Sequence, residues 1–181
     1  MAILVTHISA AVGALTWMSV EWIKTGKPTV VGIATGMVAG LATITPASGT
    51  VGPQGALLIG LFAGLICFYA TQMIKGYFKI DDSLDVFPVH GVGGILGILM
   101  LAFVGKPNGF LGAGASGFDP SVFEQFMIQL QGVVVICLWT LVFSWIALKM
   151  TSMVTDLRVS QENENEGLDI TEHNESGYST S

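Results

Sequence analysis

The residues best suited to chemistry lie in the segment DVFPVHGVGG, residues 85–94, where one histidine stands among glycines and aliphatic residues. Imidazole titrates near neutral pH and can pass a proton between its two nitrogens. An ionisable group inside a membrane span is costly and usually faces a cavity or the interior of a helix bundle. His90 is therefore a candidate to line a pore or relay protons. The alternative is a neutral histidine that hydrogen-bonds to a neighbouring helix.

Other catalytic or metal-binding patterns are missing from the sequence. No histidine or cysteine lies at ligand spacing from His90, and the acids of DDSLD lack an EF-hand continuation. There is no nucleophile–base pair and no glycine-rich nucleotide motif after a strand. Cys67 and Cys137 lie within apolar segments, where we expect ordinary packing. We therefore expect no enzyme activity, no cofactor, no metal and no nucleic-acid partner.

The composition places these residues in a membrane. Of 181 residues, 51% are hydrophobic and only 11% are charged, whereas soluble domains carry about 25% charged residues. A helix needs about 20 mostly apolar residues to cross the hydrocarbon core. The segments that meet this length predict five spans, at about residues 3–23, 29–45, 55–74, 86–104 and 122–150. The expected fold class is an all-α polytopic membrane helix bundle with a polar tail.

The charges divide the chain into a transmembrane domain, residues 1–151, and a tail, residues 152–181. Seven of the 13 acids and one of the seven bases lie in the tail. Such a segment cannot bury enough apolar surface to fold alone, so we expect it to be mobile or to fold on a partner. With five spans, six of the seven Lys and Arg residues fall on one side, which predicts a cytoplasmic tail and an external N-terminus.

The segment around His90 should open a helix. Pro88 is best tolerated in a first helical turn, which favours Asp85 as the N-cap and Val86 as the first helical residue. On a regular helix one face then carries Val86, Phe87, His90, Gly93, Gly94 and Gly97. The glycines would leave room beside the imidazole for a neighbouring helix or for a passing molecule.

Several stretches together resemble the ammonium transporter family (Amt/Mep, with the Rh proteins as relatives). They are DDSLDVFPVHGVGG, GLATITPASG and the tail segment LRVSQENENEGLDITEHNESGY, with further matches in EWIKTGKPTVVGIATGMVAG and GALLIGLFAGLICFYA. The resemblance covers nearly the whole chain, in the family's order. It implies an eleven-span fold in which two inverted five-helix halves enclose a pore and a long last helix lies outside. The first span here matches the family's seventh, so this chain is expected to supply the second half.

By this resemblance the chain takes part in ammonium or ammonia transport, through a hydrophobic pore lined by two histidines, in a homotrimer of the cell membrane. His90 matches the second pore histidine and Thr45 a threonine near the outer mouth. Val86 matches an aliphatic residue lining the inner lumen. Asp82 and Asp85 match acids at the start of the histidine helix, where capping is the expected role. The first pore histidine and the outer recruitment site are expected to precede the first span.

The tail resembles the family's cytoplasmic C-terminal region, which contacts a neighbouring subunit and, in bacteria and archaea, PII-type regulators. Gly167, Asp169 and Thr171 are the candidate regulatory residues. An alternative function is a truncated, non-transporting regulatory or scaffold fragment that assembles with full-length transporter subunits.

Overall fold

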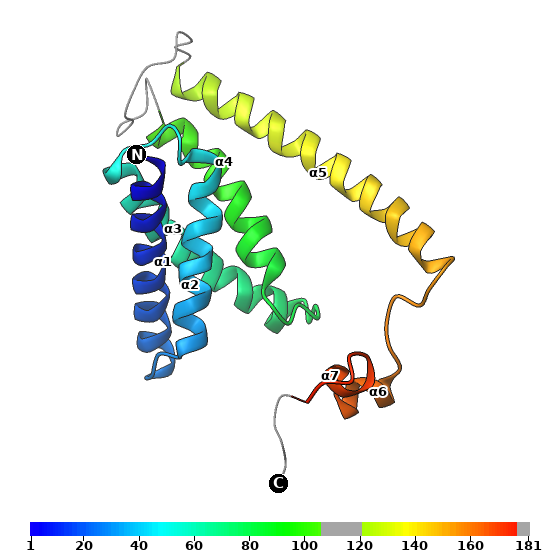
Figure 1. The fold of residues 1–181 in the computed structure, drawn as a ribbon. Helices are drawn as coiled ribbons and strands as arrows, with labels where there is room; N and C mark the ends of the chain where they lie inside the picture. Colours follow the sequence, from blue (N-terminus) through cyan, green and yellow to red (C-terminus); the bar gives the residue numbers. More distant parts are fainter. Residues whose placement is uncertain (106–120, 177–181) are drawn as a thin grey trace. The chain divides into compact units, whose positions relative to one another are not determined.

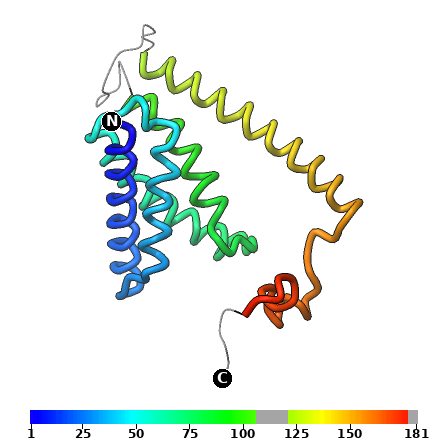
Figure 2. Tube along the Cα trace, in the orientation of Figure 1, coloured from blue at the N-terminus to red at the C-terminus, as the bar shows by residue number. Residues whose placement is uncertain are grey.

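The computed structural model describes residues 1–105 and 121–176 of the chain (Figures 1 and 2). The described residues form helices and no β-strand, which confirms the expected all-α fold. The α-helices are α1 (Ala2–Thr25), α2 (Val30–Ile44), α3 (Pro53–Gln72), α4 (Gly93–Val104), α5 (Val122–Ser152), α6 (Gln161–Glu166) and α7 (Leu168–Thr171). Three short turns adjoin them: the 3-10 turn η1 (Thr45–Ala47) and the π-helical turns η2 (Met73–Tyr77) and η3 (Phe87–Val92).

Five helical segments of the described chain are long and apolar enough to cross a membrane. They are Ala2–Thr25, Val30–Ala47, Pro53–Tyr77, Phe87–Val104 and Val122–Ser152, so the five expected spans are confirmed to within a few residues. The chain divides into two compact units, Met1–Val134 and Val135–Ser181, with the boundary inside α5. The functional division into a transmembrane domain and a tail at residue 151 stays a prediction.

Small residues let α1, α2 and α3 approach closely within the first unit. The Ser9 hydroxyl of α1 donates a hydrogen bond to the Gly40 carbonyl of α2 over 2.8 Å. A Cβ at Gly60 of α3 would lie 2.6 Å from the Ser9 carbonyl oxygen, and one at Gly64 would lie 2.7 Å from the Gly13 carbonyl oxygen. In lipid, such contacts between small residues are a main source of helix association. Glycines at these positions are therefore required by the close packing of the three helices.

Two clusters of buried apolar side chains fill the space between these helices. One contains Val5, Ile44, Ala47, Val51, Ala56, Ile59 and Val104. The other contains Trp17, Ala39, Cys67, Phe68 and Val89, and the rings of Trp17 and Phe68 meet edge to face at 5.3 Å. The second cluster reaches η3, so the residue immediately before His90 is anchored in the core. Cys67 packs there as expected, whereas Cys137 of α5 is exposed.

The connection between α1 and α2 is fixed by polar contacts. Gly26 ends α1 with φ +82°, a left-handed conformation that glycine adopts without strain. The Glu21 carboxylate accepts hydrogen bonds from the Thr29 amide and hydroxyl, at 3.0 and 2.9 Å. The Thr29 hydroxyl in turn accepts a bond from the Gly32 amide over 2.9 Å and caps α2. The Lys24 ammonium lies 4.5 Å from the centre of the Tyr69 ring, joining this end of α1 to α3.

Gly97 and Gly94 of α4 provide a matched test of this packing. A Cβ at Gly97 would collide with the Thr43 carbonyl oxygen of α2, whereas a Cβ at Gly94 meets nothing within 4 Å. We predict that Gly97→Ala destabilises the first unit by about 1–3 kcal/mol, the usual cost of overpacking. Gly94→Ala should leave stability unchanged or raise it, because alanine is the better helix former. Thermal unfolding of the detergent-solubilised chain measures both. Equal melting temperatures for the two variants would contradict the α2–α4 contact.

Candidate functional site

His90 lies within the π-helical turn η3 and its side chain is exposed, while its neighbours Pro88 and Val89 are buried. A π-helical turn uses i→i+5 hydrogen bonds and is wider than an α-helical turn, so it changes the direction of the residues that follow. A Cβ at Gly93 would lie 2.9 Å from the Thr43 hydroxyl and 3.3 Å from the Cys67 sulfur, on the packed side of the helix.

The predicted single face through His90 is therefore wrong. Gly93 and Gly97 are buried against α2, so these two glycines make room for a neighbouring helix, which was one of the two expected uses. Val86, Phe87 and His90 are exposed. Gly94 faces open space, unlike Gly93 and Gly97, which are packed. The prediction assumed a regular α-helical period through a segment in which the backbone is π-helical.

Two acids before η3 have different roles. The Asp82 carboxylate accepts hydrogen bonds from the backbone amides of Val86 and Phe87, at 2.9 and 2.8 Å. Asp82 thus satisfies amides that a helix N-terminus leaves without partners. The Asp85 carboxylate instead lies 2.7 Å from the Lys75 ammonium of η2. Val86 is the first helical residue and Asp85 precedes it at the N-cap position, as predicted, and the Asp85 carbonyl accepts the Val89 amide at 3.0 Å. The Asp85 side chain pairs with Lys75, however, and the side-chain cap comes from Asp82.

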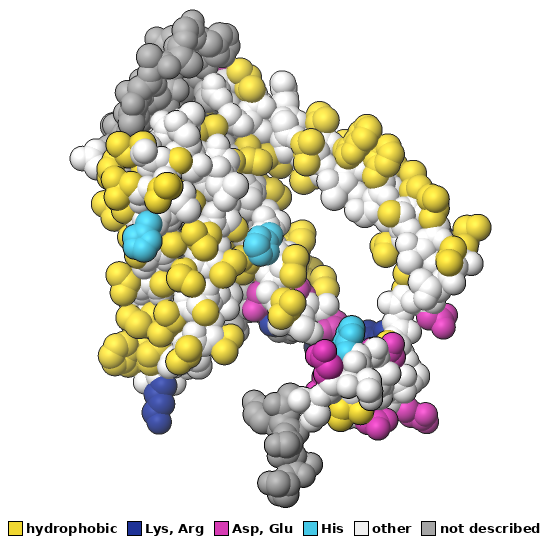
Figure 3. All heavy atoms as spheres, in the orientation of Figure 1, with side chains coloured by type: hydrophobic (Ala, Val, Ile, Leu, Met, Phe, Trp, Pro, Cys, Tyr) yellow, Lys and Arg dark blue, Asp and Glu magenta, His cyan; other side chains and the backbone are white. Residues whose placement is uncertain are grey.

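His90 opens onto a shallow pocket of about 320 Å³ between η3 and α2. The pocket is lined by Val30, Val31, Ala34, Thr35, Val38, Leu84, Val89 and His90. Figure 3 shows many hydrophobic side chains on the face of the helical bundle that also carries histidine. Among the lining residues only Thr35 and His90 have polar side chains, and His90 is the only titratable one. The pocket can therefore offer hydrogen bonds to a small neutral molecule but supplies no carboxylate for a cation.

Thr35 is a site residue that the sequence reasoning missed. Its hydroxyl donates a hydrogen bond to the Val31 carbonyl over 2.9 Å, so the oxygen lone pairs stay available to the pocket. Its place on the histidine side of α2 could not be read from the sequence. A threonine in an apolar span is equally well explained by packing, and the only sequence signal was its polarity within that span.

Two other predicted pore residues do not line this pocket. The Thr45 hydroxyl, at the opposite end of α2, donates to the Leu41 carbonyl over 2.7 Å, and the residue is exposed. Val86, whose amide is capped by Asp82, is 52% exposed. Their contacts with a transported molecule stay predictions. Within the described ranges 1–105 and 121–176, no group of three or more His, Cys, Asp and Glu side chains is arranged to hold a metal ion.

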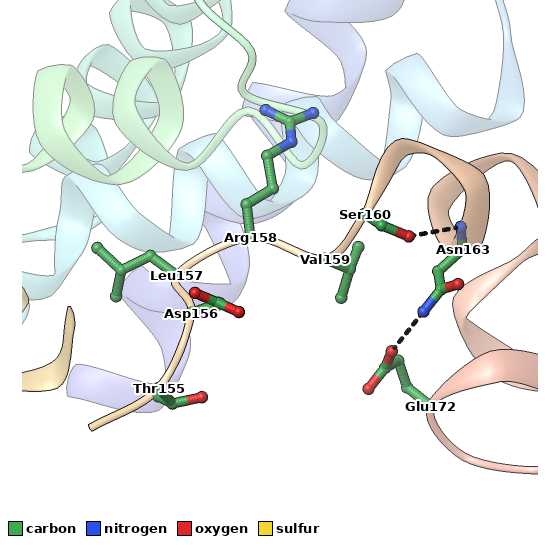
Figure 4. Close-up of a pocket in the computed structure, with 8 residues that line it drawn as sticks. All are labelled: Thr155, Asp156, Leu157, Arg158, Val159, Ser160, Asn163 and Glu172. Atoms are coloured by element: carbon green, nitrogen blue, oxygen red, sulfur yellow. Dashed lines mark hydrogen bonds between the residues drawn. The ribbon is translucent and has the colours of Figure 1, made fainter. Parts of the chain in front are cut away.

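The tail contains two short helices, α6 and α7, and no residue of either is buried. The Arg158 guanidinium contacts the Glu164 carboxylate at 2.9 and 3.1 Å. Ser160 caps α6 by accepting a bond from the Asn163 amide at 3.2 Å, and the Asn163 side chain donates to Glu172 at 3.4 Å (Figure 4). These contacts border a polar hollow of about 370 Å³. The expectation that the tail is mobile or folds on a partner stays a prediction.

The three predicted regulatory residues lie together at α7. Gly167 has φ +111°, and a Cβ there would lie 2.7 Å from the Asp169 carboxylate. This left-handed conformation favours glycine. The Thr171 hydroxyl donates to the Gly167 carbonyl over 3.1 Å, closing the turn. Their regulatory role stays a prediction.

Comparison with known proteins gives a consistent result along the whole chain. Residues 1–178 match the family model described as Ammonium Transporter Family. An ammonium transporter of Aquifex aeolicus is 39% identical over 98% of this chain and 41% of its own length. The ammonium transporter Amt1 of Archaeoglobus fulgidus is 40% identical over 98% of this chain and 44% of its own length.

Solved structures show the same similarity. A structure entitled "Sensor Amt Protein" superposes with a TM-score of 0.83 at 30% identity, covering 95% of this chain and 41% of the other. The crystal structure of Saccharomyces cerevisiae Mep2 gives a TM-score of 0.74 at 34% identity, covering 84% of this chain and 37% of the other. The chain thus spans about two fifths of the length of these relatives.

Proposed function

Because the chain belongs to the ammonium transporter family, we propose that it supplies one side of a transmembrane path for ammonium or ammonia, with His90 lining that path. The observation that carries this proposal is the exposed imidazole at an apolar pocket between η3 and α2. A bare cation in such surroundings is costly, whereas neutral ammonia is not. His90 and Thr35 can exchange hydrogen bonds with ammonia as it passes.

We further propose that helices outside this chain complete the path. The lining of the His90 pocket comes from α2, η3 and Leu84, and the pocket's open side leaves the imidazole exposed. In lipid, a polar ring left without a partner is unfavourable, so a facing helix should cover it. The chain then corresponds to the C-terminal part of a transporter subunit. Thr45 and Val86 would border the path beyond the pocket, at its outer and inner ends.

The proposed setting follows the charges and the family. The excess of Lys and Arg on one side of the spans supports a cell-membrane protein with a cytoplasmic tail and an external N-terminus. A homotrimeric assembly and a PII-type regulator at the tail are proposed from the family. Since the relatives are named as transporters, we propose transport without enzyme activity.

His90 can be tested directly in a chimeric protein in which this chain is joined to the part of A. fulgidus Amt1 that it does not match. We call this protein the complemented transporter. We predict that His90→Ala lowers methylammonium uptake at least about tenfold, because the only titratable group of the pocket is lost. His7→Ala is the matched control, since His7 is an exposed histidine of α1 outside the pocket. Uptake is measured at equal membrane abundance. Normal uptake by His90→Ala would refute a role for His90 in the path.

Thr171 can be tested as a regulatory position in the same complemented transporter. Thr171→Asp removes the hydroxyl that donates to Gly167 and adds a negative charge near Asp169 and Glu172. We predict reduced uptake and faster proteolysis of the tail. Thr171→Ser keeps the hydroxyl and should behave like the unmodified protein. If uptake and proteolysis are both unchanged in Thr171→Asp, the tail does not regulate transport through this residue.

A further inference from the structure

We propose that Lys75 and Asp85 are positioning residues for His90. Their ion pair joins the end of α3 to the start of η3 and holds η3 in the π-helical form that turns the imidazole away from the packed helices. The orientation of His90 is a property of this chain alone. Only the effect of the pair on transport rests on the proposed function.

The ion pair is short and partly sheltered. The Lys75 ammonium lies 2.7 Å from one Asp85 carboxylate oxygen, and the two side chains are 40% and 16% exposed. Asp85 has φ +56°, a conformation that few residues other than glycine adopt and that Asp and Asn tolerate best. The contact with Lys75 therefore holds the backbone in an uncommon conformation two residues before η3.

The lysine belongs to a firmly held element. It lies in η2, where the Phe78 amide donates to the Met73 carbonyl over 3.0 Å and the Ile80 amide donates to the Ile74 carbonyl over 3.1 Å. Ile74, beside the lysine, is buried. The ion pair thus connects two π-helical turns across residues 78–86, and such turns occur frequently at functional sites.

The other end of the histidine helix is fixed by packing. Gly93 and Gly97 lie against Thr43 of α2, so α4 cannot rotate without a collision. If η3 relaxed to a regular α-helix, the segment between Asp85 and the packed Gly93 would have to rewind. His90 lies within that segment, so its side chain would rotate toward the face that carries Gly93 and Gly97. The ion pair at residue 85 opposes this rewinding.

Asp82 alone does not account for the arrangement. Its two hydrogen bonds satisfy the first amides, but an amide cap is compatible with either an α-helical or a π-helical first turn. The π-helical form of η3 requires a particular position of residue 85 relative to α3. The contact with Lys75 sets that position. This separates a positioning role for the pair from general capping of the helix.

Chemical labelling of the full chain in detergent tests the orientation without any transport assay. Diethyl pyrocarbonate acylates neutral imidazole, and peptide mass spectrometry gives the rate at His90 relative to His7 in the same molecule. We expect Lys75→Met and Asp85→Asn each to lower the labelling rate of His90 relative to His7 about fivefold, because the imidazole turns toward the packed face. A fivefold change corresponds to the free energy of a partly exposed ion pair. Asp85→Asn keeps a side chain suited to positive φ. Lys75→Arg keeps the positive charge and should retain the original ratio.

Transport in the complemented protein supplies the functional readout. For Lys75→Met we expect a lower maximal rate with an unchanged KM, because orientation of the imidazole is altered while the rest of the path is intact. Lys75→Arg should recover the rate. An unchanged His90 labelling ratio in both Lys75→Met and Asp85→Asn would overturn the proposal. Equal changes in the labelling rates of His7 and His90 would also overturn it by showing a general loss of fold. A changed ratio with unchanged transport would confirm the positioning and count against the proposed function of His90.

Discussion

An imidazole exposed on the apolar surface of a membrane helix is the constraint on which the structure depends. A polar ring without partners in hydrocarbon is unfavourable, and lipid cannot supply hydrogen bonds to it. The chain places this ring at the mouth of a pocket otherwise formed mainly by aliphatic side chains, with one threonine hydroxyl. Such a site admits small molecules that exchange hydrogen bonds and carry no charge. This is the physical link between the geometry of His90 and the transport of ammonia that we propose.

The rest of the first unit serves to hold that ring in place. Glycines at the contacts of α1, α2, α3 and α4 allow backbone approaches that leave the helices little freedom to rotate. Val89, directly before His90, is fixed in the cluster around Trp17 and Phe68. The polar contacts of residues 75, 82 and 85 hold the start of η3. The position of the imidazole therefore results from apolar packing on one side and from charged contacts on the other.

The sequence predicted the features that depend on local hydropathy. The five spans, the all-α class and the polar tail follow from residue type alone, and the structure agrees closely. It did not predict features that depend on backbone register. The π-helical form of η3 cannot be read from the period of apolar residues, so the predicted face through Gly93 and Gly97 was wrong. Likewise, the ion pair of Asp85 with Lys75 depends on a turn and on a lysine ten residues away, so it could not be predicted. The local order of the tail depends on polar contacts such as Arg158 with Glu164, which composition does not reveal.

The central claim is that this chain forms one side of an ammonium path that further helices complete. The most direct measurement is growth of a strain lacking ammonium transporters, on limiting ammonium at low pH, where free ammonia is scarce. Our account predicts no growth with residues 1–181 alone and restored growth with the complemented transporter. Growth supported by the chain alone would show that its own helices enclose a path and would contradict the account. Failure of an assembled, membrane-inserted complemented transporter to restore growth would contradict it equally.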